Sequence, residues 1–321
     1  AARIAALLLL PLMLLFALNA CMTRTHPFAD GGAVAWPLAF VGFYWLARRH
    51  EGAPEAALAR LLHIASAWLL CALLSWEASW AAGEIIAGSR TWAAIAWAII
   101  PACVLISLPR LVTRIQWPFA SHRDSYLLIV GGGLGIFLGF WSCTTNLILP
   151  GDTAPLRYLP LINPLDVAQA FVLIALARYV LVLRSTRADE RSSDAARLAP
   201  AILAGLAFIW VNAVLLRTLH QWAGIPFGFA SFAESTLAET ALSIFWTLLA
   251  LATMLVAGRR RSRLVWFAGA TLLAVVIVKL FFVDLSSSGS IDRIVSFLGV
   301  GVLITIVGYL SPIPPSKESH Q

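Results

Sequence analysis

Charged residues are scarce in this 321-residue chain, at 12% of the sequence, whereas hydrophobic residues make up 60%. An average soluble domain is about 25% charged, so this composition excludes an ordinary soluble fold. The polar stretches are also short, and none is long enough to build a soluble domain with its own core. The sequence therefore predicts a protein that works in or at a membrane.

Catalytic, nucleotide-binding and metal-binding motifs are missing. The four cysteines, at positions 21, 71, 103 and 143, stand singly, without the paired spacing of zinc or redox sites. The segment 131–135 is glycine-rich like a phosphate-binding loop, but it lacks the Lys-Ser/Thr pair and lies inside an apolar run. We expect no metal and no cofactor, and whether the protein is an enzyme stays open.

Apolar runs dominate the chain, and we count about ten of them, most close to the roughly twenty residues with which a helix crosses a bilayer core. Inside lipid only helices or closed barrels satisfy every backbone group, and these runs lack the alternating pattern of barrel strands. The predicted fold class is all-α, a polytopic transmembrane helix bundle of about ten spanning helices. The runs are Ile4–Ala20, Ala33–Ala47, Leu61–Ala82, Trp92–Leu108, Tyr126–Leu149, Leu165–Leu183, Ala199–Leu219, Leu237–Ala257, Leu264–Val283 and Ile291–Leu310.

Arginines mark every second connection between these runs, and each connection in between carries at most one Lys or Arg. Lys and Arg in short loops are retained on the cytoplasmic side of a membrane. We therefore expect the arginine-rich connections and both termini to be cytoplasmic. The arginines concerned are Arg48, Arg49 and Arg60; Arg110, Arg114 and Arg123; Arg184, Arg187, Arg191 and Arg197; and Arg259, Arg260, Arg261 and Arg263.

The net charge of +7 comes from these short connections rather than from a basic helix face or tail. That distribution is typical of topology signals, so we expect membrane lipid and no nucleic acid as a partner.

The N-terminal run has some features of a secretory signal, with Arg3 before the apolar segment and Cys21 after it. The chain starts at Ala1 without a methionine, so we interpret the run as an ordinary spanning helix. We expect residues 1–321 to form a single transmembrane domain that is the C-terminal part of a longer chain.

Polar residues interrupt the apolar runs mostly toward the predicted non-cytoplasmic ends. A charged side chain deep in a bilayer costs at least about 2.5–3.5 kcal/mol, so such residues usually face a protein interior or a water-filled cavity. We expect one outward-facing polar pocket. Its candidate binding residues are Asn163, Asp166, Asn212, Arg217, His220, Lys279, Asp284, Asp292 and Arg293.

Arg217 and His220 share a helical face and can hold a phosphate or carboxylate through charge-assisted hydrogen bonds. Arg217 and Lys279 also lie near helix ends, where a long stem can reach the headgroups. Lys279 and Asp284 can instead pair with each other or with Asp292 and Arg293 in a purely structural network.

Several acidic residues also have a structural interpretation. Asn163 has the character of a helix N-cap, with Pro164 at the first helical position and Asp166 at the third, where an acid favours the helix dipole. The dipole equally explains Asp292 in a first turn. For Glu77, which lies among interfacial tryptophans, we expect a pair with an arginine from another helix.

Gly131, Gly135 and Gly139 repeat at a spacing of four residues. A ridge of small residues lets another helix approach closely. The repeat predicts that this helix lies centrally in the bundle.

Three stretches carry a family resemblance: Tyr158 to Asp166, Trp210 to His220, and Lys279 to Leu310. They resemble the bacterial predicted-membrane-protein family called domain of unknown function 2339. The resemblance is strongest from Tyr158 onward and extends over the whole chain. It implies a multi-pass protein of the bacterial inner (cytoplasmic) membrane and the C-terminal portion of a longer member, and it supplies no activity, cofactor or catalytic residue.

Two functions stay open. In the first, the polar pocket takes an anionic solute or a lipid-linked envelope precursor, for transport or for a transfer reaction. The alternative is a non-catalytic membrane scaffold or assembly partner in which the polar cluster only ties helices together.

Overall fold

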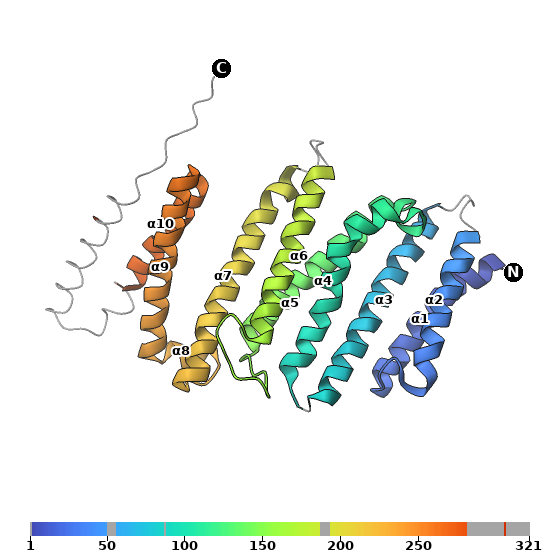
Figure 1. Cartoon of the computed structure of the whole chain (residues 1–321), viewed down its shortest axis with the longest axis horizontal. Coiled ribbons are helices and arrows are strands. Elements are labelled where there is room, and N and C mark those ends of the chain that lie inside the picture. The colour runs from blue at the N-terminus through green and yellow to red at the C-terminus, as the bar shows by residue number, and fades with distance from the viewer. Residues whose placement is uncertain (1, 50–55, 87, 187–192, 281–304, 306–321) are drawn as a thin grey trace, which may run out of the picture. The chain divides into compact units, whose positions relative to one another are not determined.

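The computed structural model describes residues 2–49, 56–86, 88–186, 193–280 and 305 (Figure 1). These residues form helices joined by turns and loops, and no strand occurs among them, which confirms the all-α class. The chain divides into two compact units, Ala1–Gly224 (unit 1) and Ile225–Gln321 (unit 2). Each unit is described by itself, and the single transmembrane domain stays a prediction.

The described part of unit 1 consists of long helices with three short helical segments between them. Prolines lie inside α1, α2, α4 and α7, which spanning helices tolerate because their neighbours satisfy the freed backbone groups. The elements are α1 (Ala2–Thr23), η1 (Ala29–Gly31), α2 (Gly32–Arg49), α3 (Ala56–Ile85), α4 (Arg90–Arg114), the π-helical η2 (Gln116–Ala120) and η3 (Ser125–Val130), α5 (Gly131–Ile148), α6 (Pro164–Thr186) and α7 (Ser193–Ala223).

Among the described residues, six helical segments are long and apolar enough to cross a membrane, and Leu8–Thr23 is a shorter apolar helix. Each predicted run from Ile4–Ala20 to Leu264–Val283 overlaps a helix, whereas Ile291–Leu310 lies outside the described residues. A multi-pass membrane protein is thus confirmed, and the count of about ten spans stays a prediction. The six segments are Leu58–Ile85, Arg90–Arg114, Ser125–Ile148, Pro164–Ser185, Leu198–Ala223 and Thr236–Arg260.

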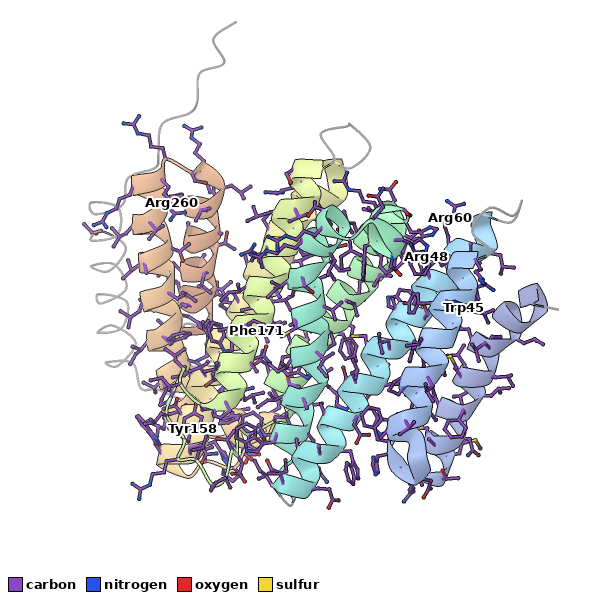
Figure 2. All side chains as sticks on the ribbon, turned by 45° about the vertical axis from the view of Figure 1, so that its right-hand side comes forward. Trp45, Arg48, Arg60, Tyr158, Phe171 and Arg260 are labelled. Carbon is purple, nitrogen blue, oxygen red and sulfur yellow. The ribbon has the colours of Figure 1, made fainter. Side chains whose placement is uncertain are left out.

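Successive helices of unit 1 run in opposite directions, so its connections alternate between two ends (Figure 1). Arg48 and Arg60 lie at one end, and Tyr158 lies at the other (Figure 2). At the Tyr158 end, the indole of Trp92 at the start of α4 donates to the Ala154 carbonyl of the α5–α6 connection, at 3.1 Å. Unit 1 therefore has an arginine-rich end and an opposite end where the predicted polar residues of α5, α6 and α7 meet.

The core of unit 1 centres on α4, α5 and α6. Ala98, Leu105, Leu138, Val172 and Ala175 have 0% of their surface exposed. Small side chains at such positions let helix backbones approach closely, which is how helices associate when the surrounding lipid is as apolar as they are. The outer helix faces carry exposed apolar side chains, as expected of surfaces that contact lipid.

The glycines of α5 differ in how closely they are packed. A Cβ atom on Gly131 would lie 2.8 Å from the Tyr179 ring of α6, and one on Gly133 would lie 2.5 Å from the Trp68 ring of α3. Gly135 and Gly139 have ordinary space beside them. Of the three glycines in the predicted ridge, Gly131 alone is in close contact with another helix. The other close contact is at Gly133, which is not part of the ridge.

Unit 2 contains α8 (Phe229–Ala233), α9 (Thr236–Arg260) and α10 (Arg263–Lys279) among its described residues. Ser235 caps α9, since its hydroxyl accepts from the Ala238 backbone at 3.3 Å. The two long helices form a tight pair, because a Cβ on Gly269 would lie 2.7 Å from the Met254 side chain.

Candidate functional site

The polar site begins where the α5–α6 connection enters α6. The Asn163 side-chain oxygen accepts from the backbone of Leu165 at 2.7 Å and of Asp166 at 3.3 Å. These are the N2 and N3 positions that an N-cap residue serves. The predicted cap at Asn163, with Pro164 at the first helical position, is confirmed.

Asp166 lies in the first turn of α6 with none of its surface exposed. Its carboxylate accepts from the Asn163 amide at 3.2 Å and from the Arg217 guanidinium at 2.7 Å. The Trp210 indole also interacts with this carboxylate, although its geometry is not that of a hydrogen bond. Asp166 thus joins the start of α6 to α7.

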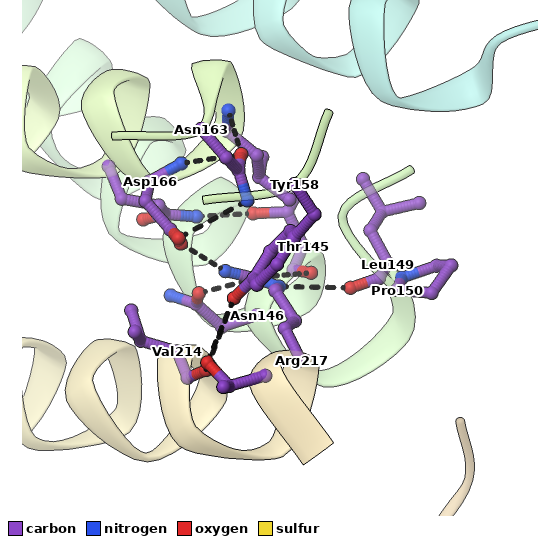
Figure 3. Close-up of polar contacts among 12 residues, drawn as sticks. Thr145, Asn146, Leu149, Pro150, Tyr158, Asn163, Asp166, Val214 and Arg217 are labelled. Carbon is purple, nitrogen blue, oxygen red and sulfur yellow. Dashed lines mark hydrogen bonds and ion pairs between the residues drawn. The ribbon is translucent and has the colours of Figure 1, made fainter. Parts of the chain in front are cut away.

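Arg217 on α7 is likewise fully buried, and every nitrogen of its guanidinium donates to a protein oxygen (Figure 3). Nη1 donates to Asp166, Nη2 to the Asn146 side chain at 2.9 Å and to the Thr145 carbonyl at 3.3 Å, and Nε to the Leu149 carbonyl at 3.1 Å. Charge-assisted hydrogen bonds of this kind are about twice as strong as neutral ones. The side chain therefore links the end of α5, the start of α6 and α7.

The α5–α6 connection packs over this arginine. Gly151 has a φ of +74°, and a Cβ there would lie 3.0 Å from the Arg217 side chain. Tyr158 of the same connection donates to the Val214 carbonyl of α7 at 3.2 Å. Burial raises the pKa of the Tyr158 phenol above its ordinary value, so the hydroxyl remains a donor at neutral pH.

A second row of buried polar groups continues from the site toward the middle of α5 and α6. Ser142 donates to the Gln169 side-chain oxygen, and the Gln169 amide donates to the Thr145 hydroxyl, each at 2.7 Å. Ser142, Thr145 and Gln169 are not among the candidate binding residues predicted from the sequence. The signal was present, because Ser142, Thr145 and Asn146 share one face of α5, and Asp166 and Gln169 share one face of α6.

Besides the Trp210 indole, two polar atoms near the site have no hydrogen-bond partner within the part of the chain that the structure describes. They are the Asn146 amide nitrogen and the Thr153 hydroxyl, and both residues are buried. A buried unpaired donor or acceptor costs about 1–3 kcal/mol, so each such group calls for an explanation.

The other predicted site residues lie elsewhere. His220 is half-buried one turn beyond Arg217 on α7. The Asn212 amide donates to the Phe208 carbonyl of its own helix at 2.8 Å. Lys279 belongs to unit 2, where it donates to the Ser243 hydroxyl at 2.9 Å and the Glu239 carbonyl at 3.4 Å. Asp284, Asp292 and Arg293 lie outside the described residues.

Glu77 corrects one prediction, because its partner is a histidine and not an arginine. Both carboxylate oxygens lie within 3.1 Å of His26 Nδ1, and the Phe28 backbone donates to the same carboxylate. The His26 ring stacks on Trp80 at a centroid distance of 3.6 Å. Glu77 therefore fixes the α1–α2 connection against α3.

Two histidines, His63 and His122, lie side by side toward the arginine-rich end of unit 1, and no sequence pattern predicts this contact. His63 of α3 is 2% exposed, and its Nδ1 lies 3.3 Å from the Tyr126 hydroxyl of η3. Its ring centroid is 4.3 Å from that of His122. Residues so far apart in the chain show no local spacing that could predict their contact.

Among the described residues, no group of three or more His, Cys, Asp or Glu side chains is placed to hold a metal ion. No curated protein and no solved structure matches the chain. A family model does match, over residues 1–314, and its description is "Predicted membrane protein (DUF2339)". The match extends over all of the helices described above, so this chain belongs to that family of membrane proteins.

Proposed function

We propose that this chain is a non-catalytic membrane scaffold or assembly partner in which the cluster around Arg217 holds α5, α6 and α7 together. The observation that carries the proposal is that the Arg217 guanidinium is fully buried and every one of its nitrogens donates to a protein oxygen. A cation in this state has no surface to offer to a solute. Its effect is to fix the register of three helices.

The proposal includes the membrane setting. About ten spans in the bacterial inner membrane, with both termini cytoplasmic, would place the arginine-rich connections inside and the Arg217 cluster in the outer half of the bilayer. The separation of Arg48 and Arg60 from Tyr158 at opposite ends of unit 1 supports this orientation (Figure 2).

A second function is favoured by the unpaired Asn146 amide and by the cover that Gly151 and Tyr158 form over Arg217. In this proposal the same cluster is the closed form of an outward-facing site for an anionic solute or a lipid-linked envelope precursor. Displacement of the α5–α6 connection would expose Arg217 and Asn146 together, and an anionic oxygen would then accept from both.

One pair of substitutions distinguishes the two functions. Arg217→Met with Asp166→Leu removes both charges and leaves apolar side chains, a change that is often neutral for a buried ion pair. The protein would be expressed in a bacterial host that lacks its own copy, and folded yield in the membrane and envelope phenotype would be measured together. If the protein is a scaffold, Arg217→Met alone should lower the folded yield and impair the phenotype, and the double variant should restore both.

A ligand site predicts the opposite combination. Folded yield returns in the double variant, but the phenotype stays lost because the anion-binding charge is gone. Arg157→Ala is the matched control, because Arg157 lies exposed on the connection that covers the site. It should leave both measurements unchanged.

A further inference from the structure

A cavity of about 270 Å³ opens between α3, α4 and α5 of unit 1, away from the Arg217 cluster. Its walls include Trp68, Ala72 and Ser75 of α3, Trp97 of α4, and Gly133 and Phe137 of α5. The cavity is open to the surroundings of the helices, since Trp68 and Ala72 on its wall are exposed. Concave, mostly apolar openings are where small molecules and lipid chains bind. A hollow of this size among three helices is therefore a candidate binding site.

The cavity lies at the middle of all three helices. Residues 68–75 are central in α3, and residues 133–137 are central in the segment Ser125–Ile148. Trp97 and Pro101 of α4 lie two to three turns from its start. Each of these segments is long and apolar enough to span a bilayer. At the centre of a span, the surrounding medium consists of lipid acyl chains.

The wall is mostly apolar, and two of its polar groups are already used within the protein. The Trp68 indole donates to the Val130 carbonyl at 3.4 Å, and the Ser75 hydroxyl donates to the Cys71 carbonyl at 2.8 Å. A water molecule needs two to four polar partners to be held in a cavity. The wall thus favours a hydrocarbon over water or a headgroup.

The hollow exists because two of the residues that line it are small. Ala72 contributes only a methyl group, and Gly133 lies against the Trp68 side chain, since a Cβ there would be 2.5 Å from the ring. A flexible hydrocarbon chain that enters the opening makes dispersion contacts with the lining from all three helices.

We propose that this cavity binds one acyl chain of a bilayer phospholipid and retains it more firmly than the lipids on the outer helix faces. A chain in the cavity contacts three helices at once, whereas a chain on an outer face contacts one or two. The lipid would then act as a bound component of unit 1 that joins α3, α4 and α5.

The test uses the full chain in vesicles of phosphatidylethanolamine and phosphatidylglycerol that contain a phospholipid with a mid-chain diazirine. After irradiation, mass spectrometry locates the lipid adducts. We expect adducts to concentrate on residues 68–75 and on Phe137. Ala72→Phe fills the hollow and should reduce these adducts several-fold, whereas Ala204→Phe, at an exposed alanine of α7, should not change them.

Other outcomes would overturn the proposal. Adducts spread evenly over the exposed apolar faces, or an unchanged pattern in Ala72→Phe, would show that the cavity holds no retained chain. Absent labelling together with a change of oligomer mass in Ala72→Phe would assign the cavity to a protein partner. If Ala72→Phe does not fold, Ala72→Leu fills less of the same space and is read by the same criteria.

Discussion

Arg217 and Asp166 form an ion pair of 2.7 Å in which neither side chain has any exposed surface. The pair joins α7 to the first turn of α6 and brings together residues that are distant in the chain. The electric fields of two opposite charges in contact largely cancel farther away. Pairing therefore lowers the free energy needed to bury each charge within a bundle of spanning helices. Four further hydrogen bonds, three from Arg217 and one to Asp166, hold the pair in place.

Arg217→Ala should be among the most destabilising substitutions in unit 1. It leaves Asp166 buried without its cation, and breaking a buried pair in this way costs about 3–5 kcal/mol. Unfolding of the purified protein in detergent micelles, followed by circular dichroism, would measure the loss. The exposed Arg157→Ala should stay within about 0.5 kcal/mol of the wild type, and equal effects of the two would refute the structural role of the pair.

Substitutions of Asn163 should separate its two roles. Asn163→Ser keeps a capping oxygen but loses the amide that donates to Asp166. Asn163→Ala loses both, and the loss of the cap alone lowers the free energy of unfolding by about 1 kcal/mol. Asn163→Asp keeps the cap but places a second carboxylate beside Asp166. We expect unfolding measurements at neutral pH to rank serine as the mildest change. An aspartate variant as stable as wild type would contradict the observed contact.

Gly151→Ala should destabilise the cover over Arg217 for two reasons. The φ of +74° disfavours any side chain, and the new Cβ would lie 3.0 Å from the Arg217 stem. Gly88→Ala is the control for the first reason alone, because Gly88 has a φ of +81° but open space around it. Backbone strain of this kind costs about 1–3 kcal/mol. Thermal unfolding should show a larger loss of stability for Gly151→Ala than for Gly88→Ala. Equal losses would mean that the contact with Arg217 adds nothing to the cost of the substitution.

Local signals in the sequence were sufficient for part of this architecture. The helix runs follow from hydropathy, and the cap at Asn163 follows from four consecutive residues whose conformational preferences agree. The placement of Asn163, Asp166 and Arg217 at one end followed from the alternation of arginine-rich connections. Each of these inferences depends on neighbours along the chain or on simple antiparallel topology.

Partner identity could not be predicted in the same way. The order of the helices along the chain does not specify which cation pairs with Glu77. His26 is its partner because the α1–α2 connection places it beside the carboxylate. His63 and His122 meet because η2 and η3 fold back toward α3, and the sequence carries no periodic signal for that path. Contacts that depend on irregular connections are determined by tertiary packing rather than by local preference.

The glycines of α5 give a prediction in which two similar substitutions have opposite signs. Gly131→Ala places a Cβ 2.8 Å from the ring of Tyr179, which is buried and whose hydroxyl donates to the Leu127 carbonyl at 2.6 Å. The ring cannot move without breaking that bond, so we expect an overpacking cost of about 1–3 kcal/mol. Gly139→Ala has the nearest atom 4.0 Å away, at Leu206, and should gain up to about 1 kcal/mol because alanine favours a helix over glycine.

Unfolding midpoints of Gly131→Ala and Gly139→Ala, measured in the same detergent, should therefore fall on opposite sides of the wild type. Destabilisation by both would mean that Gly139 also lies at a close helix contact, as the four-residue repeat by itself suggests. Tolerance of both would mean that α6 can shift away from α5 at Tyr179. In that case Gly131 would not be the position that sets the distance between these two helices.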